Sequence, residues 1–423
     1  MSAEELRTAI ENISADIEQH KAVVKKLETE RSLLQRQLNA VLDPVMRLPF
    51  EISSEIFIQC LPSNFLPEPG AAHIPMLFLN ICSSWSHIAV STPALWTAIH
   101  VQFPRPEGFG DVLEVWLQRA RNRHLSISFR GRFDDGVATV VRQHAHQLNN
   151  LEMYYHQDGD DELDPLNSIA PGPFPKLQSL TIGTVSVDEG SPLFDPNPIL
   201  DLFHLAPNFV ECTFGKVTRL RRDLIPREPL VLPTLRRLKF GRSADDIESH
   251  DGILLYLTLP GLQVLSLPMS GLFASDLIAF LKRSLPPLRN LAMGEGRGDL
   301  DFTELEQCLR LLPTLTHLKM HNPDPALVRE LFAALADSPP SFVPHLESLC
   351  IALYWDGLPQ SSWVVLHRAL SARRTYFTHF SMTCIAESPK PNAEICAAFR
   401  RLVADGMEIY IGFEEEQQNS IFL

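Results

Sequence analysis

The feature that most constrains the fold of this chain is a short leucine pattern that returns nine times. In seven copies the pattern is P-x-L-x-x-L-x-apolar, as in Pro175-Lys-Leu177-Gln-Ser-Leu180-Thr-Ile182, and the copies that start at Leu148 and Phe377 lack the proline. Its first apolar positions are residues 148, 177, 209, 235, 262, 288, 315, 346 and 377, which lie 26 to 32 residues apart. A fixed period of this length is typical of stacked repeat units.

Each unit is predicted to contain a strand, a loop and a helix. The last residues of L-x-x-L-x-L alternate with the strand period of two, and helical stretches follow, for example at 276–284, 305–312, 326–336 and 363–372. A single unit cannot bury its apolar face, whereas stacked units share one core. We therefore expect an α/β leucine-rich-repeat-like solenoid over residues 110–423, a horseshoe with a parallel sheet inside and helices outside. Leu180, Leu238, Leu265 and Leu318 should occupy neighbouring rungs of one ladder.

The residues that flank the second anchor of each unit are expected to point away from the core, onto the concave face. They are Ser179 and Thr181, Glu211 and Thr213, Arg237 and Lys239, Val264 and Ser266, Asn290 and Ala292, His317 and Lys319, and Ser348 and Cys350. Arg237, Lys239, His317 and Lys319 are basic in a chain of net charge −14. One hypothesis is a site for an acidic or phosphorylated target protein. The other is that they are solvated strand residues without a ligand.

Residues 1–42 are predicted to form one long helix with a heptad pattern. Apolar side chains occupy most core positions: Ile10, Ile17, Val24 and Leu38 at a, and Leu6, Ile13, Leu27, Leu34 and Val41 at d. His20 and Arg31 interrupt the series. β-Branched residues at a with leucines at d favour a parallel homodimer through residues 6–41. The alternative is a single amphipathic helix that lies on the rest of the chain.

Residues 44–103 are predicted to hold short amphipathic helices separated by prolines. Pro44 ends the first helix because proline disfavours helical geometry in the preceding residue. One helix is expected within 45–61, with Pro49 near its first turn. A proline-rich loop covers 62–75, a second helix or pair of helices lies within 74–90, and a strand covers 99–103.

This middle segment resembles an F-box. The matching residues are Leu48-Pro49-x-Glu51-Ile52, Ile56-Phe57 and Ile81-Cys82-x-x-Trp85-x-x-Ile88-Ala89. A heptad helix, an F-box and divergent leucine-rich repeats in this order also resemble F-box proteins of mushroom-forming fungi. The resemblance implies that the side chains listed next insert into the adaptor subunit of a cullin–RING ubiquitin ligase. They are Leu48, Pro49, Ile52, Ile56 and Trp85.

The chain departs from these families at a few positions. Ser83 stands where a basic residue often follows the cysteine of an F-box, and the 62–75 insertion is longer than usual. In three central repeats, Ser270, Gly296 and Pro323 stand where leucine-rich repeats usually have Asn or Cys. About 45 residues are too few to bury a good core alone. Segment 44–103 is thus expected to be covered by a partner, or else to cap the solenoid.

Composition argues against several other classes of protein, namely nucleic-acid-binding, membrane and secreted proteins. A pI near 5.5 argues against a broad nucleic-acid or anionic-membrane surface, and no apolar run reaches the length of a membrane span. The first thirty residues carry charges throughout, which predicts no secretory signal. Seven scattered cysteines without a C-x-x-C pair predict reduced core thiols in the cytoplasm or nucleus.

Catalytic signals are weak. His144 and His146 with His156 could gather a metal ion or be ordinary surface histidines, and the glycine-rich stretch 294–299 lacks the order of a phosphate-binding loop. The acidic stretch 158–164 is expected to be an exposed loop. We predict no catalytic, cofactor-binding or metal-binding residue.

Three functions remain open on the sequence alone. The expected function is a substrate receptor of an SCF-type ubiquitin ligase, and the alternative is a non-catalytic scaffold that uses the heptad helix and the repeats. A third possibility, a hydrolase built on the solenoid, needs a pocket of titratable groups that the sequence does not reveal.

Overall fold

The computed structural model describes residues 3–42, 44–62, 66–70, 72–155, 169, 172–184, 196–215, 228–240, 252–267, 274–294, 301–337, 341–353, 358–384 and 391–413. The chain forms two compact units: unit 1 holds Met1–Val101 and Asp111–Ser126, and unit 2 holds Gln102–Gly110 and Ile127–Leu423. The predicted acidic loop at 158–164, His156, and residues 295–299 of the glycine-rich stretch lie outside the described residues, as do Ser270 and Gly296.

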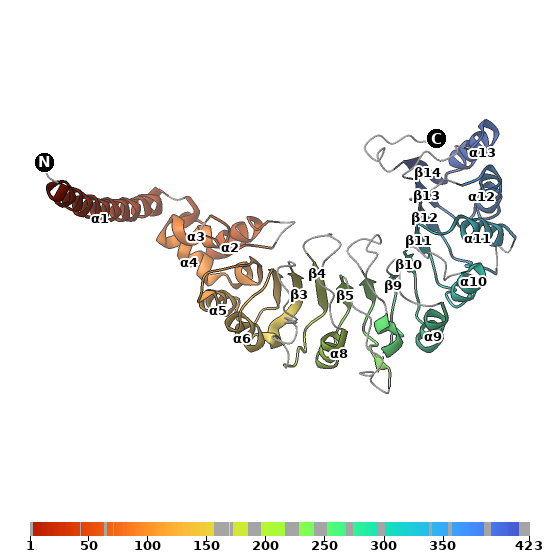
Figure 1. Ribbon diagram of the computed structural model, residues 1–423, viewed down its shortest axis with the longest axis horizontal. Helices are drawn as coiled ribbons and strands as arrows, with labels where there is room; N and C mark the ends of the chain where they lie inside the picture. The colour runs from red at the N-terminus through yellow and green to blue at the C-terminus, as the bar shows by residue number, and fades with distance from the viewer. Residues whose placement is uncertain are drawn as a thin grey trace. The chain divides into compact units, whose positions relative to one another are not determined.

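Unit 1 is mainly helical (Figure 1). Its elements are α1 (Ala3–Leu42), η1 (Pro44–Arg47), α2 (Phe50–Gln59), α3 (Met76–Ile81), α4 (Ser83–Ser91) and η2 (Pro93–Trp96). Three further elements continue from one unit into the other: β1 (Ala98–Gln102), α5 (Phe109–Arg119) and β2 (Leu125–Arg130). The long first helix and the pair of helices within 74–90 are thus confirmed. Pro49, predicted near the first turn, is the N-cap residue of α2.

Aromatic rings hold the helices of unit 1 together. The ring centroid of Phe57 lies 4.2 Å from that of Phe78 and 4.9 Å from that of Trp85, which joins α2, α3 and α4. At the end of α4, the Thr92 hydroxyl donates to the carbonyl of Ile88 and lies 3.0 Å from the Ser54 hydroxyl. These contacts satisfy the polar groups that the helices bury.

Unit 2 alternates strands with helices along the chain. Its strands are β3 (Leu148–Tyr155), β4 (Ser179–Thr184), β5 (Glu211–Phe214), β6 (Leu230–Val231), β7 (Arg237–Phe240), β8 (Leu257–Thr258), β9 (Val264–Ser266), β10 (Asn290–Met293), β11 (His317–His321), β12 (Ser348–Leu353), β13 (His379–Cys384) and β14 (Glu408–Phe413). Its helices are α6 (Asp135–Gln143), η3 (Ala145–Gln147), α8 (Pro196–Leu205), η5 (Gly252–Tyr256), α9 (Ala274–Ser284), α10 (Phe302–Arg310), α11 (Pro325–Asp337), α12 (Gln360–Ala372) and α13 (Ala393–Ala404).

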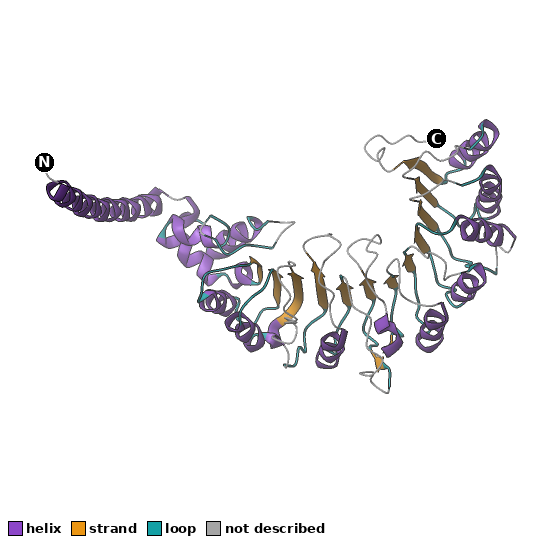
Figure 2. Cartoon of the chain, viewed as in Figure 1, coloured by secondary structure: helices purple, strands orange, loops and turns teal. Residues whose placement is uncertain are grey.

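The main sheet of unit 2 is parallel, with the strand order β3-β4-β5-β7-β9-β10-β11-β12-β13-β14. Helices lie along one side of this sheet (Figure 2). The fold of unit 2 is therefore mixed α/β, with helices packed beside a parallel sheet. This arrangement is compatible with a solenoid.

The register of the sheet confirms the predicted ladder of second anchors. Leu238 pairs with Leu265, Leu265 with Leu291, and Leu291 with Leu318. Cys212 pairs with Leu180 on one side and with Leu238 on the other, and so fills the position between them in the same ladder. All of these anchors are buried. One apolar row therefore runs across the sheet, and each anchor packs against its neighbours in the adjacent units.

Backbone hydrogen bonds extend the ladder beyond the strands themselves. The carbonyl of Gln263 accepts from the amides of Arg289 and Asn290, and the carbonyl of Arg289 accepts from the next unit in the same way. Polar side chains next to the prolines add to it. The Thr234 hydroxyl donates to the carbonyl of Pro207, and the Asn208 amide donates to that of Pro175. These bonds link successive units just before the strands begin.

The structure differs from the prediction at the ends of the repeats. Strand β14 pairs with β13 but was not predicted, because Gly406 stands where the other units have their first apolar anchor. Ser348, expected to point outward and be accessible, is buried. Helices α8 and α13 follow the anchors at 177 and 377, where each unit was predicted to have a helix. The short parallel pair β6-β8 and the helices α5 and α6 were not predicted.

Candidate functional site

An exposed apolar stripe runs along one side of α2 in unit 1. It consists of Leu48, Ile52 and Ile56, whose residues are 41%, 50% and 41% exposed. Residues four apart lie on the same face of a helix, and the first of them stands just before Pro49, the N-cap of α2. The opposite side of α2 is buried. The core of unit 1 thus uses the side of α2 that carries Ser53, Ser54 and Phe57, and the apolar stripe stays exposed.

Trp85 lies apart from this stripe. Its ring is half-buried and packs against Phe57 and Phe78, and its amide donates to the sulfur of Cys82 at the start of α4. Leu48, Ile52 and Ile56 are therefore on one face, whereas the Trp85 ring contacts Phe57 and Phe78. Pro49 is exposed beside the stripe.

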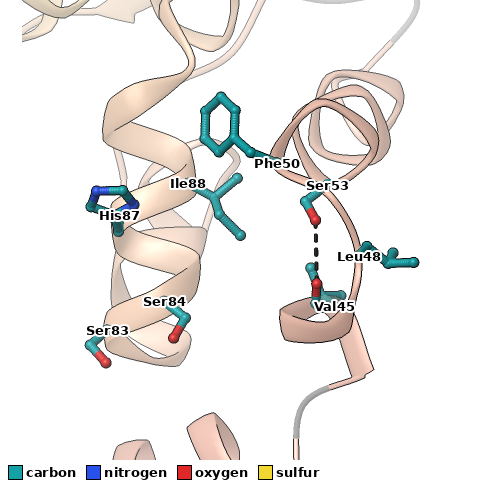
Figure 3. Close-up of a pocket in the computed structure, with 8 residues that line it drawn as sticks. All are labelled: Val45, Leu48, Phe50, Ser53, Ser83, Ser84, His87 and Ile88. Carbon is teal, nitrogen blue, oxygen red and sulfur yellow. Dashed lines mark hydrogen bonds between the residues drawn. The ribbon is translucent and has the colours of Figure 1, made fainter.

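A shallow pocket of about 350 Å³ opens between α2 and α4, next to the stripe (Figure 3). Its lining is Val45, Leu48, Phe50, Ser53, Ser83, Ser84, His87 and Ile88. The Ser53 hydroxyl lies 3.3 Å from the carbonyl of Val45 and so joins η1 to α2. Phe50 and Ile88 point into the space between the two helices. Four of the lining side chains are apolar, and the other four are three serines and a histidine.

On unit 2, the sheet residues that point away from the buried anchors form a second candidate surface. We call this the open face. The sheet register aligns its residues in rows; one row contains Glu211, Arg237, Val264, Asn290 and His317 in successive strands. The next row contains Thr213, Lys239, Ser266, Ala292 and Lys319. The two rows continue through Ser179 and Thr181 on β4 and through Ser348 and Cys350 on β12. All predicted outward positions therefore belong to the two rows, although Ser348 is buried.

The four basic residues of the open face do not form one cluster. Arg237 and Lys239 lie on β7, and His317 and Lys319 lie on β11, with β9 and β10 between them. Three strand spacings separate the two pairs by about 14 Å. A single phosphate group cannot contact both pairs, so the predicted site is divided in two.

Glu211 neutralises part of the first pair. One carboxylate oxygen lies 3.1 Å from Nη1 of Arg237 and the other lies 3.0 Å from Nζ of Lys239. Burial alone would raise the pKa of Glu211, but the hydrogen bonds and charges of Lys239 and Arg237 outweigh it, and the pKa is lowered. The carboxylate is therefore ionised at neutral pH. The sequence already contained this counter-charge, one unit before the two cations, but only the strand register brings the three groups together.

Within the described residues, no group of three or more His, Cys, Asp or Glu side chains is placed to hold a metal ion. None of the described helices combines the length and the apolar character that a membrane crossing requires.

Comparisons with known proteins add no family. Neither a scan against models of protein families nor a search of curated proteins finds a match.

Proposed function

We propose that this chain is a non-catalytic substrate receptor of an SCF-type cullin–RING ubiquitin ligase. Its F-box-like helices in unit 1 would bind the adaptor subunit, and its leucine-rich-repeat-like horseshoe in unit 2 would bind a target protein. The ubiquitin chemistry would belong to the other subunits. Holding the target near them raises its effective concentration. Such a receptor would work in the cytoplasm or nucleus, where cysteines stay reduced.

The exposed stripe Leu48, Ile52 and Ile56 is the observation that carries this proposal. Large apolar side chains on a second helix face are costly in water, and a partner helix or groove that covers them would gain their burial. The adjoining pocket between α2 and α4 gives the partner a place for a side chain of its own. The sequence around the stripe is also the part that resembles an F-box.

The open face of unit 2 supports the binding of a target. Its two rows present small and polar side chains between two separated basic positions. We propose that a target with spaced acidic groups binds across β7 to β11, with Lys319 and His317 contacting one group. Arg237 and Lys239 would contact a second acidic group of the target only if that group displaced Glu211 from them.

Capture of a purified ligase adaptor subunit tests the docking half of the proposal. Leu48→Ala/Ile52→Ala should weaken capture by at least about tenfold, because both side chains would be buried in the complex. Val112→Ala/Val115→Ala on α5 is the matched control. Those two valines are 46% and 47% exposed in the same unit, and their truncation should leave capture unchanged. Calorimetry or surface plasmon resonance on the full chain measures both.

The rival function is a scaffold in which α1 and the repeats bind partners without any ligase. The exposed apolar positions of α1 favour it as a second candidate. If the unaltered chain does not bind the adaptor at micromolar concentration, or if the α2 and α5 variants bind it equally, the receptor proposal fails and the scaffold remains.

A further inference from the structure

The helix α1 exposes an apolar seam along its whole length. The core heptad positions occupied by apolar residues are all between 44% and 80% exposed. They are Leu6, Ile10, Ile13, Ile17, Val24, Leu27, Leu34, Leu38 and Val41. A helix of 40 residues is about 60 Å long. An apolar seam of this length favours a partner that covers it.

The contact of α1 with α3 does not use this seam. Nη2 of Arg36 on α1 lies 3.4 Å from the side-chain oxygen of Asn80 on α3. In the heptad of Ile10 and Leu34, residue 36 is at position f, on the side of the helix opposite the a and d positions. The hydrogen bond from Arg36 to α3 and the seam therefore occupy different faces of α1.

The surface of the seam has the form that a coiled-coil partner needs. A hollow of about 370 Å³ lies on α1, lined by Leu27, Glu30, Arg31, Leu34, Gln35 and Leu38. These residues occupy positions d, g, a, d, e and a. In a coiled coil, the side chain of one helix inserts into a hole formed by core and flanking residues of the facing helix.

The charges beside the seam fit a second copy of this chain. In a parallel pair, Glu30 at position g of one copy lies beside Arg31 at position a of the other. Asp16 at g likewise faces Lys21 at e of the other copy. In the single chain Lys21 pairs with Glu18, with both side chains exposed, so an exchange of partners costs little. No g–e′ pair between positions 9 and 42 would place like charges together in this arrangement.

We propose that α1 pairs with α1 of a second copy of this chain as a parallel, in-register, two-stranded coiled coil. The β-branched residues at a and the leucines at d favour two parallel strands. Arg31 would pack beside its counterpart and be neutralised by Glu30 from both copies. The pairing does not depend on ligase binding, and it would make each assembly bivalent for its partners.

Two aspartate substitutions on α1 of the full chain test the seam. Leu27 at d is 57% exposed and Leu33 at c is 56% exposed, so Leu27→Asp and Leu33→Asp make the same change at equally exposed sites. We expect light scattering to give twice 47.6 kDa for the unaltered chain and for Leu33→Asp. Leu27→Asp should give the monomer mass. A monomeric unaltered chain at about 10 µM, or identical behaviour of the two variants, overturns the proposal.

A cysteine near the N-terminus tests the direction of the pairing. In a Cys60→Ser background, which removes the exposed cysteine, Leu6→Cys should oxidise to a disulfide-linked dimer, since the two copies of residue 6 face each other in a parallel pair. Leu33→Cys in the same background should stay unlinked. In an antiparallel pair the two copies of residue 6 lie about 50 Å apart, so a Leu6→Cys dimer that does not crosslink excludes the parallel arrangement.

Discussion

The guanidinium of Arg373 is almost completely buried in unit 2 and donates hydrogen bonds to three backbone carbonyls. Nε donates to Leu335 and Nη1 to Val343, both at 2.9 Å, and Nη2 donates to Phe342. Burial lowers the pKa of Arg373 to about 10. Val343 has a φ of 44°, a conformation that β-branched residues rarely adopt. Arg373 therefore stabilises a strained turn that leads into the next strand.

Removal of this side chain's charge should destabilise the fold. Arg373→Met keeps much of the apolar volume but removes one donor from each of three carbonyls, of which the Val343 carbonyl keeps the amide of Leu346. We expect the free energy of unfolding to fall by about 2–4 kcal/mol, measured by urea denaturation. Arg374 is the matched control, because it is adjacent and exposed. Arg374→Met should change stability by less than about 0.5 kcal/mol, and an equal effect of the two substitutions would contradict this account of Arg373.

The buried thiols should make stability depend on alkaline pH. Burial, together with the nearby charge of Glu304, raises the pKa of Cys308 to about 12, and burial and Glu211 raise the pKa of Cys212 well above its ordinary value. The unfolded thiol ionises near pH 9.0, whereas the folded thiol stays protonated. Their contribution to stability is thus complete below pH 9 and is lost as pH rises toward the folded pKa.

At pH 10 the loss should be about 1 kcal/mol per thiol relative to pH 8. Urea denaturation at the two pH values measures it, and the Cys308→Ala variant should show a smaller difference between them than the unaltered chain. At pH 8 a thiol reagent should modify the exposed Cys60 rapidly and leave Cys212 and Cys308 unmodified in the folded protein. Rapid modification of all three would show that the core opens far more often than the burial of these thiols implies.

At the scale of the single strand, the second anchors should dominate stability. Leu265 is buried in β9 between Leu238 and Leu291. Leu265→Ala removes contacts with both neighbouring units and should cost about 2–5 kcal/mol, read from the urea midpoint. Val264→Ala, one residue earlier on the open face, should cost less than about 1 kcal/mol. A larger effect at Val264 than at Leu265 would reverse the assignment of the two faces.

The strands were also the elements that the sequence predicted best. An anchor such as Leu318 repeats at fixed spacing because each unit must bury the same positions, so its neighbours in the ladder follow from the period alone. Strand β14 was not predicted because Gly406 interrupts the leucine pattern, although Ile409 and Ile411 continue the strand alternation. A strand at the end of a sheet needs to match only one neighbour, and its sequence is less constrained.

The candidate sites were harder to predict than the strands. The charges of Arg237 and Lys239 are visible in the sequence. Their pairing with Glu211 depends on the register between β5 and β7, which belong to different repeat units. The same holds for Trp85, whose packing against Phe57 removes it from the exposed stripe on α2. Periodicity places a residue on a face, whereas a specific contact depends on the neighbouring element.

At the scale of the whole molecule, the exposed apolar surfaces of unit 1 are separate from the ladder of buried anchors in unit 2. The stripe on α2 and the seam on α1 are exposed in unit 1, while unit 2 is built around a ladder of its own. Substitutions on the stripe or the seam should therefore leave the repeats folded. This separation makes the binding tests described above interpretable in the full chain.

The ladder of unit 2 has a consequence for how such a protein can change over generations. Each rung bonds to the one before and the one after through backbone groups that any residue possesses, and its anchors are interchangeable leucines, phenylalanines and methionines. Duplication or deletion of one whole unit in the gene would leave every remaining rung with equivalent neighbours. The length of the open face can then change without a redesign of the core.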